Sequence, residues 1–223
     1  MSTQTSTITN RIDTATVSTS KVIRNTYTLL SLTLIFSGLV AGVSMALNLP
    51  HPGIMLTLVG YFGLLFAITK FRNQGLGIAL VFALTGFMGY TLGPILNAYL
   101  SLANGGSIIM MAMGSTGAIF LGLSGYALVS RKDFSFMGGF LVVGILVAFI
   151  AGLAAIFLQM PMLSLAVSSM FVLLMSGLIL YQTSAIIHGG ETNYVMATVT
   201  LFVSIFNLFT SLLHLLGFMG GEN

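Results

Sequence analysis

The chain has 223 residues, of which 57% are hydrophobic and only 5% are charged. Soluble domains carry roughly a quarter charged residues, so this composition excludes a soluble globular fold and predicts a protein surrounded by lipid. The net charge of +3 comes from seven basic and four acidic residues, too few for a nucleic-acid-binding surface, and the absence of cysteine excludes disulfides and thiolate metal sites.

The N-terminal segment, residues 1–24, is polar. Eleven of its first twenty residues are Ser or Thr. Such a stretch cannot bury enough apolar surface to offset the entropy lost on ordering, so we predict a disordered tail. The first apolar run behind it is too long for the core of a signal peptide, and we expect it to remain as a membrane anchor.

Seven long apolar runs follow the tail and predict an all-α bundle of seven transmembrane helices over residues 25–223. Most are near the roughly 20 residues that cross the ~30 Å hydrocarbon core of a bilayer, and the second is short. The runs are about Tyr27–Leu47, Ile54–Thr69, Leu76–Leu100, Ile108–Val129, Phe136–Leu158, Leu163–Ile187 and Val195–Phe218.

The basic residues occupy the tail and alternate loops. They are Arg11, Lys21 and Arg24 in the tail, Lys70 and Arg72 after the second run, and Arg131 and Lys132 after the fourth. The intervening loops, residues 48–53, 101–107 and 159–162, contain no Lys or Arg. The positive-inside rule therefore predicts a cytoplasmic N-terminus, and an odd number of spans places the C-terminus on the periplasmic side.

Small residues recur at four-residue spacing within the runs. They are Gly38 and Gly42, Gly89 and Gly93, Gly114, Ala118 and Gly122, and Gly144, Ala148 and Gly152. Such stripes let helix backbones approach closely in lipid, so we expect them to pack the bundle. Pro94 lies inside the third run and has no N–H to donate, so Gly93 and Pro94 are the candidate kink of that helix.

A polar seam runs along one face of the last apolar run. Its residues, at spacings of 4, 3, 4 and 3, are Thr200, Ser204, Asn207, Ser211 and His214. A polar face in an apolar helix is expected to point into the bundle or a wet cavity, as an interhelical contact or an ion path. Gln182 in the sixth run needs partners for its amide, which Ser204 or Asn207 could supply. We group Lys70 with these residues as the candidate interior site.

Catalytic and metal chemistry have little support. The four acidic residues all lie in tails or loops: Asp13, Asp133, Glu191 and Glu222. No carboxylate is therefore expected at membrane depth to bind a hard cation or relay protons. The segment from Gly122 to Gly125 resembles the nucleophile segment of rhomboid proteases, but Ser124 would need a base such as His188 within reach and an oxyanion donor. We predict no enzyme, cofactor or metal.

Several segments resemble the Bax inhibitor-1 family. They are Lys21–Tyr27, followed by Leu29–Leu34, then Leu92–Asn97, Arg131–Asp133 with Ser135 and Phe136, and Ile186–Tyr194. Together they span nearly the whole chain. Gly93-Pro94-x-Leu96 resembles the element shared across the family, and the run from His188 to Tyr194 is similar to that of bacterial members that modulate the protease FtsH.

The resemblance implies an inner-membrane protein that binds and restrains FtsH, an ATP-dependent, membrane-anchored protease that extracts substrates by a cytoplasmic tail. A tail engaged by the protease would include Ser2, Thr3 and Ser20. The expected partners are FtsH and the lipid bilayer, with no nucleic acid and with the oligomeric state left open.

The resemblance also carries an alternative, because the family contains calcium-leak members closed by two aspartates with an arginine nearby. The positions that correspond by motif are Gln182, Ser204 and Lys70. An amide and a hydroxyl do not ionise in the physiological range, so pH-gated leak is not expected. A calcium or proton leak without that gate remains the second hypothesis, and a hydrolase built on Ser124 is the third.

Overall fold

The computed structural model describes the backbone of residues 2–220 and the side chains of residues 19–220. Within that range the chain forms seven long helices and one 3-10 turn. They are α1 (Ser2–Ala46), α2 (Ile54–Phe71), α3 (Gly75–Leu100), α4 (Gly105–Ser130), η1 (Ser135–Met137), α5 (Gly138–Phe157), α6 (Pro161–Ile187) and α7 (Tyr194–Gly220). Each long helix contains a segment long and apolar enough to cross a membrane, which confirms the seven predicted spans.

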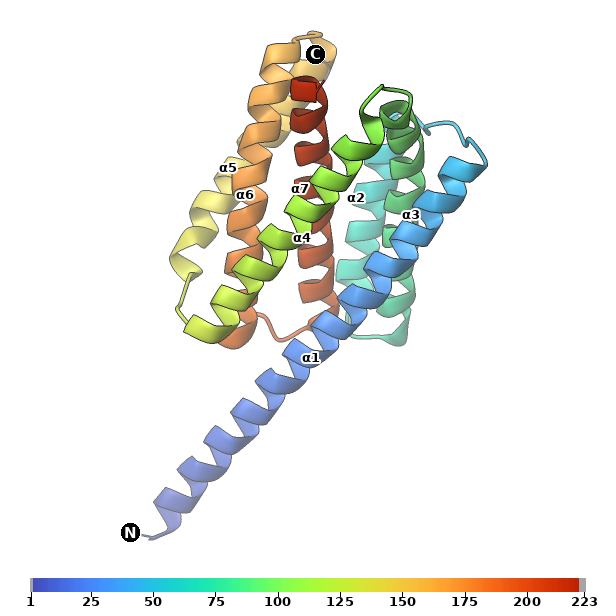
Figure 1. The fold of residues 1–223 in the computed structure, drawn as a ribbon. Coiled ribbons are helices and arrows are strands. Elements are labelled where there is room, and N and C mark those ends of the chain that lie inside the picture. Colours follow the sequence, from blue (N-terminus) through green and yellow to red (C-terminus); the bar gives the residue numbers. More distant parts are fainter. Residues whose placement is uncertain (1, 221–223) are drawn as a thin grey trace.

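The bundle is built around α7. This helix packs against α1, α3, α4 and α6, while α2 packs on α3 and α5 on α6 (Figure 1). Its buried side chains include Phe202, Leu201 and Leu208, which join the main hydrophobic core. The loops after α2, α4 and α6 lie at one end of the bundle, and the C-terminal end of α7 lies at the other.

Helix α1 extends far beyond the bundle (Figure 1). Its membrane-spanning part begins near Thr19, and the same helix continues back to Ser2 through the segment predicted to be disordered. A Ser/Thr-rich helix that projects from the bundle gains little from tertiary packing and is marginal in water. Disorder of this tail in solution therefore stays a prediction.

The glycine stripes do not all pack helices together. A Cβ atom added at Gly89 would collide with the backbone of Ser37, and one at Gly93 with Ser44, so this stripe brings α3 against α1 as expected. Gly144 likewise lies against Leu174 of α6. By contrast, nothing lies within 4 Å of such an atom at Gly38, Gly42, Gly114 or Gly122. The prediction that these four glycines pack against a neighbouring helix was wrong, because four-residue spacing identifies a helix face but not the neighbour that lies against it.

Candidate functional site

The predicted polar seam divides into two parts. Ser204 is fully buried and donates a hydrogen bond to the carbonyl of Thr200 at 2.7 Å, within its own helix. Asn207 donates to Val203 O at 2.8 Å, again within α7. Ser204 and Asn207 therefore do not bond Gln182, contrary to the prediction. The Gln182 side chain is 6% exposed, and its Nε2 has no hydrogen-bond partner. Lys70 is exposed at the end of α2 over the ring of Phe71, outside the bundle interior.

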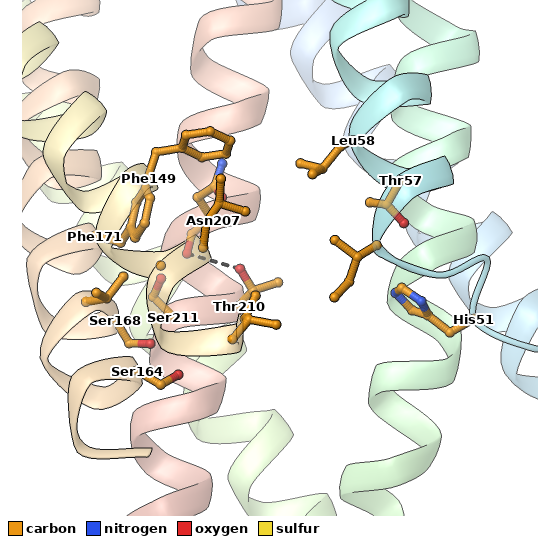
Figure 2. A pocket seen from close by; sticks show the side chains of 15 residues that line it. His51, Thr57, Leu58, Phe149, Ser164, Ser168, Phe171, Asn207, Thr210 and Ser211 are labelled. Atoms are coloured by element: carbon orange, nitrogen blue, oxygen red, sulfur yellow. Dashed lines mark hydrogen bonds between the residues drawn. The ribbon is translucent and has the colours of Figure 1, made fainter. Parts of the chain in front are cut away.

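The C-terminal part of the seam lines a cavity of about 390 Å³ between α2, α5, α6 and α7. Figure 2 shows Asn207, Thr210 and Ser211 between Ser164 and Ser168 on one side and the α2 residues on the other. The remaining wall is largely apolar and includes Phe149, Phe171, Leu58 and Leu153. The polar groups of the lining are hydroxyls, one amide and His51, with no carboxylate or Lys, so the cavity offers uncharged hydrogen-bonding groups in a mainly apolar wall.

His214, which the seam also included, bonds a residue of the cavity wall. Its Nδ1 lies 2.8 Å from the Oγ of Ser168 on α6. The sequence analysis missed Ser164 and Ser168, although Ser164, Ser168 and Ser169 stand out as hydroxyls in an apolar run. The Ser168–His214 pair joins α6 to α7 in the half of the bundle that contains the C-terminal end of α7.

The kink motif forms a contact between α3 and α1. Pro94 has no N–H, so the carbonyl of Tyr90, four residues earlier, loses its usual helical donor. The hydroxyl of Ser44 on α1 donates to that carbonyl at 3.0 Å. Gly93 leaves room for Ser44 to approach, and α3 continues through Pro94 as one helix. The kink itself stays a prediction, and the carbonyl that Pro94 leaves without a donor has a replacement hydrogen bond from Ser44, as is typical of proline in membrane helices.

The candidate nucleophile Ser124 does not face His188. Its hydroxyl lies 3.4 Å from that of Thr183, which is also 3.2 Å from the hydroxyl of Tyr27. The ring nitrogens of His188 face backbone carbonyls instead. This arrangement joins α1, α4 and α6 and gives Ser124 no base among the described residues.

The run from His188 to Tyr194 ties together the loops at the end of the bundle from which the tail projects. His188 Nε2 lies 3.1 Å from the carbonyl of Arg131, and Ser184 Oγ donates to that of Lys132 at 3.1 Å. Asn193 caps α7 by accepting hydrogen bonds from Val195 N and Met196 N. Its amide also donates to Asn73 Oδ1 at 2.8 Å. We call the contacts made by Ser184, His188 and Asn193 the loop clasp.

Asp133 sits in the loop that the clasp holds. The backbone N–H of Ser135 donates to its carboxylate at 2.8 Å. That bond, then the Ser135 side chain and the nearby His188, hold the pKa of Asp133 below its ordinary value.

Most of the proposed protease-engaged tail lies in residues whose side chains are not described. Ser2 and Thr3 are among these residues, whereas Ser20 is described and is exposed on α1.

Among the described residues, no cluster of three or more His, Asp or Glu could hold a metal ion.

The family described as inhibitor of apoptosis-promoting Bax1 matches residues 19–221. A protein of Escherichia coli K12 named modulator of FtsH protease YccA is 57% identical over 205 residues, covering 92% of this chain and 93% of its own. A Pseudomonas aeruginosa protein is 56% identical over 204 residues, 92% of each chain. A Pasteurella multocida protein is 51% identical over 194 residues, covering 87% of this chain and 88% of its own. The chain therefore belongs to the Bax inhibitor-1 family.

Proposed function

We propose that this protein is a multi-pass inner-membrane regulator that binds and restrains the protease FtsH. The observation that carries the proposal is the 57% identity, over nearly the full length of both chains, to a protein named modulator of FtsH protease. The relative's name and the family point to a membrane regulator rather than an enzyme.

The proposed orientation has the N-terminal tail in the cytoplasm. All seven basic residues lie in the tail or in the loops after α2 and α4, the pattern that the positive-inside rule associates with the cytoplasmic side. The segment that follows α6 is hydrogen-bonded to each of those two loops, at the end where α1 leaves the bundle. The C-terminus is then periplasmic.

In the proposed mechanism the tail is the handle that FtsH engages, and the bundle resists extraction. The contacts that favour resistance are distributed over the span. Ser44 bonds Tyr90 in the outer half of the α1–α3 pair, and Asn97 of α3 donates to Met45 O at 3.1 Å near the end of α1. At the opposite end, Thr198 of α7 donates to the carbonyl of Thr26 at 3.2 Å. Pulling on α1 would have to break all of these.

A pull-down from membranes tests this proposal. The full-length chain and a variant lacking residues 2–20 are each captured from cells that contain FtsH. We expect FtsH to co-purify with the full-length chain, and we expect the truncated chain to turn over more slowly because its handle is gone. A matched control replaces residues 2–20 with a Gly/Ser linker of equal length. FtsH-dependent turnover that is the same with and without the tail would refute the handle, and no co-purification would refute the binding.

The second candidate function is an ion leak, which the cavity between α2, α5, α6 and α7 favours. Asn207 and Ser211 face this cavity, while Ser204 lies deeper in the same helix. Calcium or proton flux into liposomes that contain the purified protein, and its loss in Ser204→Leu, would support a leak. Absence of flux in the folded wild-type protein would rule it out.

A further inference from the structure

The loop after α4 carries two basic side chains at the end of the bundle from which the tail projects. Arg131 and Lys132 are both exposed. Their backbone carbonyls are held by α6: His188 Nε2 lies 3.1 Å from that of Arg131, and Ser184 Oγ donates to that of Lys132 at 3.1 Å. The N–H of Phe134 also donates to Ser184 Oγ, at 3.0 Å. The loop clasp therefore fixes the backbone of this loop and leaves its two cations exposed.

Arg131 has a backbone conformation that its residue type disfavours. Its φ of 50° and ψ of 26° lie in the left-handed region, at the C-terminal end of α4. Helix ends of this kind are usually occupied by Gly, because a Cβ atom raises the energy of the left-handed conformation. An arginine at this position costs backbone energy that a glycine would not, which favours a role for its side chain beyond the turn.

Three aromatic rings lie beside these cations. Lys132 Nζ is 6.0 Å from the ring centroid of Tyr126. The Tyr126 ring is 6.2 Å from that of Phe134, which is 6.5 Å from that of Phe136. Tyr126, near the end of one span, is 47% exposed, and Phe136, at the start of the next, is 79% exposed. Exposed aromatic rings at the ends of spans are typical of the boundary between hydrocarbon and headgroups, so the two cations lie at headgroup depth.

We propose that Arg131 and Lys132 bind the headgroup of an anionic phospholipid, with the rings of Tyr126 and Phe136 against the part of its acyl chains nearest the headgroup. The lipid phosphate accepts hydrogen bonds from both cations. Basic residues at a membrane surface favour anionic over zwitterionic lipids, because only the anionic headgroup carries a net charge. This inference does not depend on whether the protein binds FtsH.

One acidic side chain opposes the site. Asp133 follows Lys132 directly, and its carboxylate accepts a hydrogen bond from Ser135 N at 2.8 Å. The carboxylate is thus engaged by the backbone of its own loop. Two basic residues and one acidic residue leave this loop with a net charge of +1, so it still attracts an anion, although less strongly than the two cations would alone.

The loop after α2 offers a matched control. It also carries two exposed cations, Lys70 and Arg72. Lys70 lies 5.6 Å from the ring centroid of Phe71, which is partly buried. Lys70→Gln therefore removes the same charge as Lys132→Gln, from the same end of the bundle, without touching the exposed aromatic rings. A general attraction between anionic lipids and surface charge would respond equally to both changes.

Native mass spectrometry of the purified full-length protein measures the binding. The protein in neutral detergent is titrated with dioleoyl phosphatidylglycerol, or with dioleoyl phosphatidylcholine, which has the same chains and no net charge. We expect phosphatidylglycerol to bind more tightly. Lys132→Gln should weaken its binding about fivefold, the usual contribution of one basic residue at an anionic surface, and Lys70→Gln should have little effect. Equal binding of the two lipids, or an equal loss in the two variants, would overturn the proposal.

Two further measurements distinguish the whole lipid from its headgroup. Phe136→Ala should weaken the binding of both lipids without changing the preference between them. Phe157→Ala removes a similarly exposed ring, 73% exposed, at the far end of α5, and should change neither quantity. Unchanged lipid binding in Phe136→Ala would contradict the aromatic contact. Excess inorganic phosphate should leave the lipid bound, and displacement by phosphate would identify a site for soluble anions and overturn the lipid assignment.

Discussion

A single hydroxyl accounts for how α3 accommodates proline. Pro94 removes the donor for the Tyr90 carbonyl, and Ser44 supplies another from the neighbouring helix. Gly93 makes the approach sterically feasible. Ser44, Gly93 and Pro94 therefore form a three-residue packing unit between α1 and α3.

The Ser44 hydrogen bond should show coupling to Pro94. Ser44→Ala leaves the Tyr90 carbonyl without a donor and should lower the free energy of unfolding by about 1 kcal/mol. In a Pro94→Ala background the helix supplies its own donor to the Tyr90 carbonyl. Ser44→Ala should then lower the free energy of unfolding by clearly less. Thermal or steric-trap unfolding of the four proteins measures the coupling. Strict additivity would show that Ser44 does not compensate for the proline.

Asp133 predicts a stability change in acid. A carboxyl whose pKa is lower in the folded than in the unfolded chain stabilises the fold at pH values above its unfolded pKa, which is about 3.9. That contribution is lost as pH falls through the folded pKa. The melting temperature of the wild type should therefore exceed that of Asp133→Asn at pH 5–7, and the difference should shrink as pH falls below the unfolded pKa of about 3.9. A difference in melting temperature that does not shrink below the unfolded pKa would contradict the assignment.

At the scale of helices, the α1–α3 pair shows why small-residue stripes are ambiguous. α1 presents Ser37, Ala41 and Ser44 to α3, while a Cβ atom added at Gly38 or Gly42, one position away, would meet nothing within 4 Å. Both sets are small and both have helical spacing. Lipid and a neighbouring helix are equally apolar, so hydropathy could not distinguish the two faces.

Paired glycine substitutions test which face packs. Gly89→Ala places a methyl group against the backbone of Ser37, so α1 must shift, at a cost of about 1–3 kcal/mol. Gly42→Ala meets nothing within 4 Å and should be neutral, or stabilising by up to about 1 kcal/mol through helix propensity. Unfolding of both variants in the same detergent provides the comparison. Equal effects would mean that α1 and α3 do not pack as described.

At the scale of the whole molecule, the sequence predicted the spans more fully than the site. Apolar runs are a strong signal because every backbone polar group in lipid must be paired within a helix. The seam was predicted less well because Ser204 and Asn207 bond carbonyls of their own helix, an option that spacing alone does not reveal. The Ser168–His214 pair and the loop clasp join residues 46 and 57 positions apart, so they required the tertiary arrangement.

The proposed restraint of FtsH is tested by the half-life of an FtsH membrane substrate in cells. The full-length protein, the variant lacking residues 2–20 and the equal-length Gly/Ser-tail control are produced at matched levels. Restraint predicts that the full-length chain lengthens the substrate's half-life and that the truncated chain does so much less. A substrate half-life unchanged by the full-length protein would show that the chain does not restrain FtsH.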